Sequence, residues 1–558
     1  MKIIENADRS VLLFSDDQQK IRPRDLWLCI LFVLAFAGCF LLIGLAAQRV
    51  MKPVPHYVLP FSAAFLRLGA WLPGSQSGAV GRHAPAANYI EMFIFILLAF
   101  AVYGVAVLLV RRYADMTGAK KVITIFTGVG SVVAGLLLVG MPVLLSQDLF
   151  VYADYGHVLV AYGANPFFIP PSAISHDAIT RVDNWSFATS AYGPVWMYIC
   201  ALFAFVGGEH PGYYYLLFRL FAFACYLVNC LLVNNILRDC SPRTRVLGTL
   251  LYAWNPLVLL ESCLGAHNDV LVNTFMLLGI YLALRAERRD FTRNYYAPLL
   301  VCSLAVLVKF TMLPLIALFL LLLGCKTFEQ GVGSGWSRFR AAAGNICLGG
   351  AIFAIFSLAC YLPLWLGHSI PEIAKSFSTP PSAWWAENSL LRTIQEWLKA
   401  NGAPDPASPL YLPASLLRQR VVWDRISTVA LACTLLVGAF YLWRKPTVYR
   451  LVLLLLASLC VLLVVTPWFY PWYVQWLITL AVVALAHPLP RLGKAFFIFA
   501  LVFSVSAMTI YLDPALVSFG SALDTRVLAN IGVPLLAASL AFWMAKSHNR
   551  TSPAAPAH

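Results

Sequence analysis

Long apolar runs separated by short polar segments make up most of the 558-residue chain. Each run has roughly 18–25 residues, which as an α-helix suffices to cross a hydrocarbon core about 30 Å thick. The strands of a membrane barrel would instead alternate apolar and polar residues over about ten positions. The pattern therefore predicts an all-α fold, a polytopic integral membrane protein with about 14 transmembrane helices plus interfacial helices.

The predicted spans are Leu26–Ala47, Tyr89–Val110, Val122–Leu145, Tyr213–Leu237, Val246–Leu264, Val270–Leu284, Ala297–Val308, Phe310–Gly324, Ile346–Leu366, Ile426–Trp443, Leu451–Val465, Tyr473–Ala486, Ala495–Leu512 and Val527–Ala545. The short seventh and eighth spans could form one long helix. Read as a hairpin with Lys309 at its tip, they leave most lysines and arginines on one side of the membrane, as the positive-inside rule requires. We therefore expect the hairpin.

The charge of the chain fits a membrane protein. Lys and Arg number 40 against 25 Asp and Glu, the net charge is +15, and the mean hydropathy is +0.76. In a soluble protein this excess would suggest nucleic acid, but here basic residues gather in short loops such as "RRYADMTGAKK" and "RAERRDFTR". Such loops are typical of the cytoplasmic face. We expect the lipid bilayer as a partner and no nucleic acid.

The same rule gives the predicted domain boundaries. Residues 1–24 form a cytoplasmic segment, residues 25–545 the membrane domain, and residues 546–558 a disordered cytoplasmic tail. No cleavable signal is evident, so we expect the inner (cytoplasmic) membrane with both termini inside. The 13 cysteines include no CxxC pair, so neither a zinc site nor a disulfide framework is indicated.

Two large segments, 146–212 and 368–425, are predicted to lie outside. Within the first, the apolar run Tyr192–Gly208 has a proline near its start and closely precedes a full span. We expect a half-inserted or interfacial helix there, because irregular backbone at membrane depth must line a protein cavity. Within the second, "LLRTIQEWL" places its apolar residues on one helical face, as is typical of an interfacial helix.

Asp148 stands three residues beyond the third span, where the first outer segment begins. On a helix continuing from it, Tyr152 and Tyr155 would share its face, and Asp154 and His157 would pair at i and i+3. A carboxylate at this place could cap the helix, because helix N-termini favour negative charge, or it could be catalytic. The residues alone leave both interpretations open.

A second polar group comprises Glu261, near the outer end of a span, and His267, Asn268 and Asp269 in the turn that follows. Carboxylates inside a bilayer cost roughly 2.5–3.5 kcal/mol on insertion scales and therefore face a cavity or a partner. The His-Asn-Asp sequence is equally ordinary turn chemistry. Both a functional and a structural role remain open for this turn.

Two isolated cations, Arg219 within the fourth span and Lys309 at the hairpin tip, are predicted at similar depth. They would suit an anionic group such as a lipid phosphate. The alternative is snorkelling, chiefly for Lys309. The run "PWFYPWYVQW" supplies Trp472 and Tyr473, either to an aromatic belt or to the wall of a site for a sugar ring or a polyprenyl chain.

The order of these motifs resembles a known family. From about Ser146 to Trp476, the series "YGANPF", "YGPVW", "NPLVLLE" with "HND", "LAVLVKFT" and "FYPWYVQW" is similar to multi-spanning GT-C glycosyltransferases that use polyprenyl-phosphate sugars. The likeness is greatest to bacterial polyprenol-phosphate-mannose-dependent mannosyltransferases. The first two and the last two spans match only weakly.

The resemblance implies roles for individual residues. Asp148 matches the general base, and Arg219 resembles the arginine that meets the donor phosphate, with Lys309 as a second cation. The remaining substrate-binding candidates are Tyr152, Asp154, Tyr155, His157, Tyr192, Glu261, His267, Asn268, Asp269, Trp472 and Tyr473. Many relatives carry two adjacent acidic residues where this chain has Gln147 before Asp148. We assign no metal ligand and no cofactor, and the sequence leaves open whether a divalent cation is required.

The implied activity is transfer of a hexose, mannose by this likeness, from a polyprenyl-phosphate donor to an extracytoplasmic glycan or glycolipid, with inversion at the anomeric carbon. No GxxxxGK[ST] loop occurs, in keeping with a lipid phosphate as the leaving group. A transporter or flippase of a lipid-linked saccharide is the alternative, and it would need polar residues near the membrane midplane. A ligase with a pyrophosphate-linked donor would want more cations at the outer face.

Overall fold

The structure is a computed structural model that describes residues 23–50, 60–70, 84–114, 119–174, 177, 179–180, 183–208, 211–401, 408–409, 411–512 and 531–547. The predicted cytoplasmic segment 1–24 lies outside these residues except for its last two. The predicted tail 546–558 also lies outside them, except that residues 546 and 547 continue the last helix.

Helices account for nearly all of the described structure, and the only β-type pairing in it is one isolated bridge between Glu387 and Trp468. The helices in chain order are α2 (Pro23–Val50), α3 (Pro60–Ala70), α4 (Ala86–Tyr113), α5 (Ala119–Gly140), α6 (Asp148–Ala161), α7 (Pro194–Gly207), α8 (Pro211–Ile236), α9 (Pro242–Ala253), α10 (Pro256–Leu259), α11 (Asp269–Arg289), α12 (Phe291–Asn294), α13 (Tyr296–Val308), α14 (Leu313–Gln330), α15 (Gly335–Trp365), α16 (Ile370–Ser376), α17 (Pro381–Trp384), α18 (Leu390–Asn401), α19 (Tyr411–Leu417), α20 (Arg420–Arg444), α21 (Val448–Val465), α22 (Val474–Ala484), α23 (Arg491–Ser506) and α26 (Val533–Ser547).

The predicted spans coincide with apolar helices. Ten described helices are long and apolar enough to cross a membrane, and a bent pair, Pro242–Ala253 with Pro256–Leu264, makes an eleventh. The pair bends by 50° where Pro256 removes a backbone donor and Asn255 caps the new helix. The remaining three predicted spans are the shorter helices α13, α22 with its preceding turn, and α26. The all-α polytopic fold is confirmed.

The short seventh and eighth spans form a hairpin, as their charge pattern predicts. Lys309 at the end of α13 pairs with Asp269, the first residue of α11, at 2.9 Å. Lys326, near the end of α14, pairs at 2.8 Å with Glu287, near the end of α11. The helix α11 runs from one end of the bundle to the other, and the two lysines pair with its opposite ends. The chain therefore turns back at Lys309, whose φ and ψ of −150° and 115° interrupt the helix.

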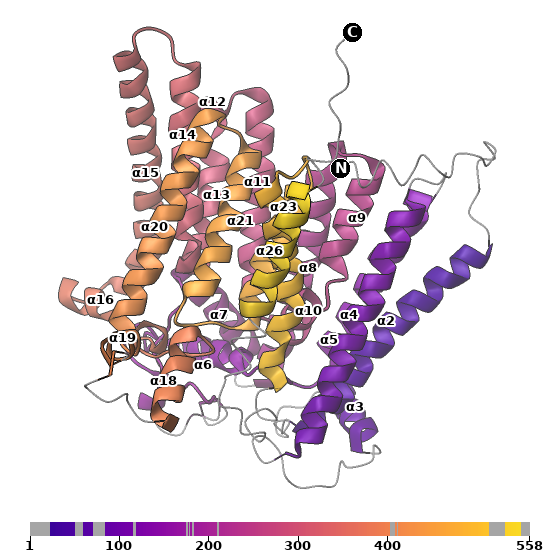
Figure 1. The fold of residues 1–558 in the computed structure, drawn as a ribbon. Coiled ribbons are helices and arrows are strands. Elements are labelled where there is room, and N and C mark those ends of the chain that lie inside the picture. Colours follow the sequence, from indigo (N-terminus) through magenta and orange to yellow (C-terminus); the bar gives the residue numbers. More distant parts are fainter. Residues whose placement is uncertain are drawn as a thin grey trace, which may run out of the picture.

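The two ends of the bundle differ in charge. The end reached by α12, at the top of Figure 1, has several basic helix termini, including Arg111 and Arg112 of α4 and Arg288 of α11. At this basic end, Arg288 pairs with Asp239, and the backbone N–H of Val448 donates to Glu287. The opposite end, called the cavity end here, carries α6, α16, α18 and α19 (Figure 1).

The helix α7 lies across the cavity end without crossing the bundle. The N–H of Gly193, just before α7, donates to the carbonyl of Val308 beside the hairpin tip at 2.9 Å. The helix ends at Gly207, next to the start of α8, and the two ends of α7 therefore lie at the same end of the bundle. This arrangement agrees with the predicted half-inserted or interfacial helix.

The apolar face of α18 is partly covered. Leu391 is fully buried beside Trp423 of α20, with Ile394 packed against them. Trp397 on the same helix is 46% exposed, and Trp384 of α17 is 54% exposed. This side of the cavity end therefore presents aromatic side chains outward, as an element that lies on a membrane requires.

Candidate active site

A cavity of about 350 Å³ lies at the cavity end, within the size range of small-molecule sites. Its polar lining includes Asp148 from the start of α6, Lys309 from the hairpin tip and Arg420 from the start of α20. Aromatic residues supply much of the remaining wall: Tyr155, Phe167, Trp185, Tyr192, Phe310, Tyr361, Trp365, Phe377, Trp468, Tyr470, Trp472 and Tyr473.

Asp148 reaches the cavity because α5 stops at Gly140 and an irregular segment follows. Leu145 in this segment has a positive φ of 68°, an uncommon conformation that reverses the chain before α6. The residue that caps α6 is Gln147, so Asp148 is the first helical residue and not the cap. Its N–H donates to Ser146 Oγ at 3.3 Å, and its side chain is 17% exposed. The Ser146 hydroxyl donates to Oδ1 of Asp148 at 3.5 Å, and the carboxylate remains accessible from the cavity.

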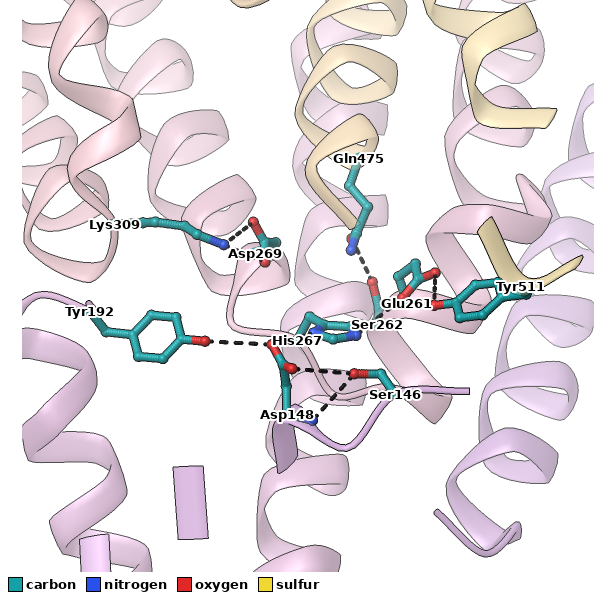
Figure 2. A network of polar contacts seen from close by, with 10 residues as sticks. All are labelled: Ser146, Asp148, Tyr192, Glu261, Ser262, His267, Asp269, Lys309, Gln475 and Tyr511. Atoms are coloured by element: carbon teal, nitrogen blue, oxygen red, sulfur yellow. Dashed lines mark hydrogen bonds and ion pairs between the residues drawn. The ribbon is translucent and has the colours of Figure 1, made fainter. Parts of the chain in front are cut away.

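Two side chains approach the carboxylate of Asp148 from the bundle. The hydroxyl of Tyr192 donates to Oδ2 at 3.5 Å, and Nδ1 of His267 lies 3.6 Å from the same oxygen (Figure 2). His267 is completely buried, and its ring stacks on Trp472 at 3.8 Å. The sequence-predicted Tyr192, His267 and Trp472 therefore converge on Asp148.

A second carboxylate lies behind His267. Oε2 of Glu261 is 3.2 Å from Nε2 of His267, and the hydroxyl of Tyr511 donates to Oε1 of Glu261 at 2.8 Å (Figure 2). Ser262 next to Glu261 donates to Gln475 at 2.9 Å. Glu261 itself does not line the cavity, and its contact with His267 connects it to Asp148.

Lys309 is one of the two cations that the described residues supply to the cavity wall. Its ammonium contacts both oxygens of Asp269, at 2.9 and 3.0 Å, and lies 4.3 Å from the ring centre of Tyr473. Asp269 is fully buried, while Lys309 borders the cavity. The predicted residues Asp269, Lys309 and Tyr473 thus form one unit, in which a single ammonium group faces the site.

Arg219 lies elsewhere. Its guanidinium is buried and donates to the carbonyls of Val139, in the last turn of α5, and of Met141 and Pro142, just beyond its end. Arg219 does not line the cavity, and its donors serve to hold the segment that leads into Asp148. The second cation of the cavity wall is Arg420, which also donates to the carbonyls of Trp385 and Ser382.

The other candidates of α6 have separate partners. His157 pairs with Asp177 at 2.6 Å, so the predicted pair of Asp154 with His157 is wrong. Asp154 instead accepts a hydrogen bond from Thr180 at 2.8 Å. Burial, together with the neighbouring Asp183, holds the pKa of Asp154 well above its usual range. These groups fix the outer loop to α6 and do not line the cavity.

Of the two tyrosines of α6, one lines the cavity and the other is buried behind it. Tyr155 lines the cavity and donates to the carbonyl of Ala188 at 3.1 Å. Tyr152 is fully buried, with its ring 5.3 Å from that of Tyr192 and 5.0 Å from that of Trp196. Asn268 is buried too and does not border the cavity.

Sequence reasoning missed Arg420, Trp185 and Tyr470 as cavity residues. An arginine at the first residue of a predicted span is so common at a water boundary that nothing marks Arg420 out. Trp185 lies in a loop, where no hydrophobic periodicity indicates which way a side chain points. Tyr470 lies in a run of aromatic residues, and nothing in the sequence distinguishes it from its neighbours. Among the described residues, no group of three or more His, Cys, Asp or Glu side chains could hold a metal ion.

The fold and the site define a class, a multi-pass membrane protein with a carboxylate and cations around one cavity at one end of its helical bundle. Residues 61–324 match the family described as alpha-(1->6)-mannopyranosyltransferase, N-terminal domain. The match supports glycosyltransferase activity and a GT-C-type mannosyltransferase, as the resemblance implied. It includes Asp148, His267 and Lys309. No curated protein and no solved structure matches the chain significantly.

Proposed function

We propose that the protein transfers a mannosyl group from a polyprenyl phosphate to a glycan or glycolipid on the extracytoplasmic side of the inner membrane. The observation that carries the proposal is the cavity that brings the carboxylate of Asp148 and the ammonium of Lys309 together in a membrane mannosyltransferase. A general base and a cation for a departing phosphate are what such a transfer requires.

The charge of the two bundle ends supports the proposed side of the membrane. Basic helix termini gather at one end, and the cavity lies at the other. Because basic loops favour the cytoplasm, the cavity would open on the extracytoplasmic side. Both termini would then lie in the cytoplasm.

In the proposed reaction, Asp148 takes the proton of an acceptor hydroxyl as its oxygen attacks the anomeric carbon. The bond from that carbon to the phosphate oxygen breaks on the opposite face, and the lipid phosphate leaves with the electron pair. A single displacement of this kind inverts the anomeric carbon. Base assistance is worth roughly 10²–10⁴ in rate. Lys309 and Arg420 would stabilise the phosphate charge.

The apolar part of the cavity supports a lipid-linked donor. Phe310 at the hairpin tip, Tyr361 near the end of α15, and Leu462 and Leu463 near the end of α21 all line it. α15 faces outward over most of its length, with Ile355 68% exposed. A prenyl chain could therefore lie against these helices while its phosphate reaches Lys309.

The other wall of the cavity suits a saccharide. The ring centres of Trp185 and Trp468 are 5.8 Å apart, and those of Trp468 and Tyr470 are 5.6 Å apart. Aromatic faces combine apolar contact with polar edges. Serine and threonine hydroxyls of residues 189–190 border the same space. We place the acceptor on this side, near Asp148.

The test is release of polyprenyl phosphate from purified protein that is given a polyprenyl-phosphate mannose and a mannose-containing acceptor. Asp148→Asn should reduce transfer by orders of magnitude while donor binding is retained. Asp239→Asn is the matched control, because Asp239 is an exposed carboxylate at the basic end. Retention of more than about a tenth of the activity by Asp148→Asn would remove Asp148 as the base. The anomeric configuration of the product, read by NMR, tests inversion.

A further inference from the structure

The backbone around His267 is shaped to place one imidazole between two carboxylates. Residues Leu260–Leu264 form a π-helical turn, a rare element that recurs at functional sites. The turn ends with Ala266 at a positive φ of 53°, and the N–H of His267 then donates to the carbonyl of Glu261 at 3.1 Å. The chain thus folds His267 back over the residue whose carboxylate its ring contacts.

Close packing leaves no freedom for this ring. A Cβ on Gly265 would lie 2.6 Å from Cδ2 of His267, so glycine is required beside it. On its other side the ring stacks on Trp472 at 17°. Since the imidazole is fully buried between Asp148 and Glu261, it has no direct access to a ligand in the cavity.

We propose that His267 is a positioning residue that orients Asp148 and keeps it charged, and that Glu261 in turn holds His267 in this role. The inference rests on the proposed function of Asp148 as the base. It replaces the sequence-based prediction that His267 and Glu261 bind substrate, because neither borders the cavity.

The charges around the ring support this role. Burial alone would lower the pKa of His267, but hydrogen bonds and charge from Asp148 and Glu261 outweigh it and raise the pKa to about 9. The positive charge on the ring lies between two carboxylates and attracts both of them. Trp472 can also stabilise the cation through its ring face.

The other charged groups near this assembly are Asp183, whose carboxyl interacts with the charge of Asp148, and the pair of Asp269 with Lys309. Asp269 is offset by Lys309 at 2.9 Å, so the pair adds little net charge. The neighbouring hydroxyls belong to Tyr192 and Tyr511, which donate to Asp148 and Glu261, and to Tyr152, Tyr470 and Tyr473. Burial raises the pKa of Tyr152, of Tyr192 and of Tyr470, so these hydroxyls stay neutral.

The experiment measures kcat/KM for transfer against pH in His267→Asn and Glu261→Gln. An Asn amide can still donate to Asp148 but carries no charge, so the acid limb should move to higher pH by about one to three units. Glu261→Gln removes one anion from the imidazolium, which then loses its proton more readily, so the alkaline limb should move to lower pH. KM for the donor should change little in either variant, because neither side chain borders the cavity.

His157→Asn is the matched control, since His157 also pairs with a carboxylate in this region but does not contact Asp148. Its two limbs should match those of the wild type. Thermal unfolding checks folding, and Glu261→Gln carries the test if His267→Asn does not fold. An unshifted acid limb in His267→Asn, or an unshifted alkaline limb in Glu261→Gln, overturns the inference while Asp148→Asn remains inactive. Activity in Asp148→Asn instead overturns the proposed function.

Discussion

Lys309 is expected to have two separable functions, one in stability and one in donor binding. Lys309→Met would leave the fully buried carboxylate of Asp269 without its cation. Breaking a buried ion pair in this way costs about 3–5 kcal/mol. Loss of the ammonium over the ring of Tyr473, at 4.3 Å, adds about 0.5–2 kcal/mol. Asp269 begins α11, where the helix end favours a negative charge by about 0.3–1 kcal/mol, so we expect a net loss near the lower end of this range.

A double variant, Lys309→Met with Asp269→Asn, removes both charges. Most of the lost stability should return, because replacing a whole buried pair by neutral groups is often close to neutral. Donor affinity should stay weakened in both variants, by about 1.5–3 kcal/mol for a lost charged hydrogen bond, or roughly 10- to 150-fold. Unfolding in mixed micelles measures stability, and calorimetric titration with a polyprenyl-phosphate sugar measures donor affinity.

Lys326→Met is the matched control for this pair of measurements. Lys326 forms a similar pair with Glu287 at 2.8 Å, but at the basic end of the bundle. It should lower stability and leave donor affinity unchanged. A double variant as unstable as Lys309→Met would refute the role of the ion pair. Wild-type donor affinity in the double variant would refute the contact with the phosphate.

Three further predictions concern packing, pH and topology. A Cβ on Gly193 would lie 2.0 Å from a backbone oxygen of the hairpin tip, so Gly193→Ala should shift the start of α7 and lower kcat, whereas Gly350→Ala, with open space around it, should not. The pKa of Asp154 is raised by burial, so thermal stability should fall as pH rises above the ordinary range of an aspartate, and Asp154→Asn should flatten that fall in melting curves. Ser408→Cys, in a chain without native cysteines, should react with an impermeant thiol reagent in intact spheroplasts, and labelling only after permeabilisation would place the cavity in the cytoplasm.

The spans were predictable because a bilayer forces every backbone group to pair within its own helix, which demands long apolar runs. The hairpin at Lys309 was predictable for a different reason. No apolar pattern distinguishes it from one long helix, but the distribution of lysine and arginine does. The ion pairs from Lys309 and Lys326 to the two ends of α11 show that this second signal was sufficient.

The sequence predicted which residues belong to the site better than it predicted which of them contact one another. Asp148, Tyr192, His267 and Lys309 stood out as polar residues at the ends of apolar runs, and the structure gathers them. The partner of each residue depends on the rotation of its helix about its own axis. The position of a residue along a span does not determine that rotation. Arg219, predicted beside the donor, therefore lies against the end of α5. The π-helical turn that pairs His267 with Glu261 has no periodic signature in the sequence.

The shortness of α13 has a consequence for the surrounding lipid. Its 13 residues span about 20 Å, whereas the 31 residues of α15 span about 46 Å. In a bilayer with a hydrocarbon core of about 30 Å, the shorter helix would end short of the outer boundary, so its tip would lie within the depth of the surrounding lipid. Lys309 and Asp148 would then lie at the floor of a depression in the membrane surface. If the proposed function holds, a depression of this kind would admit the free end of a saccharide chain more readily than its middle, and would favour elongation at termini over branching along a polymer.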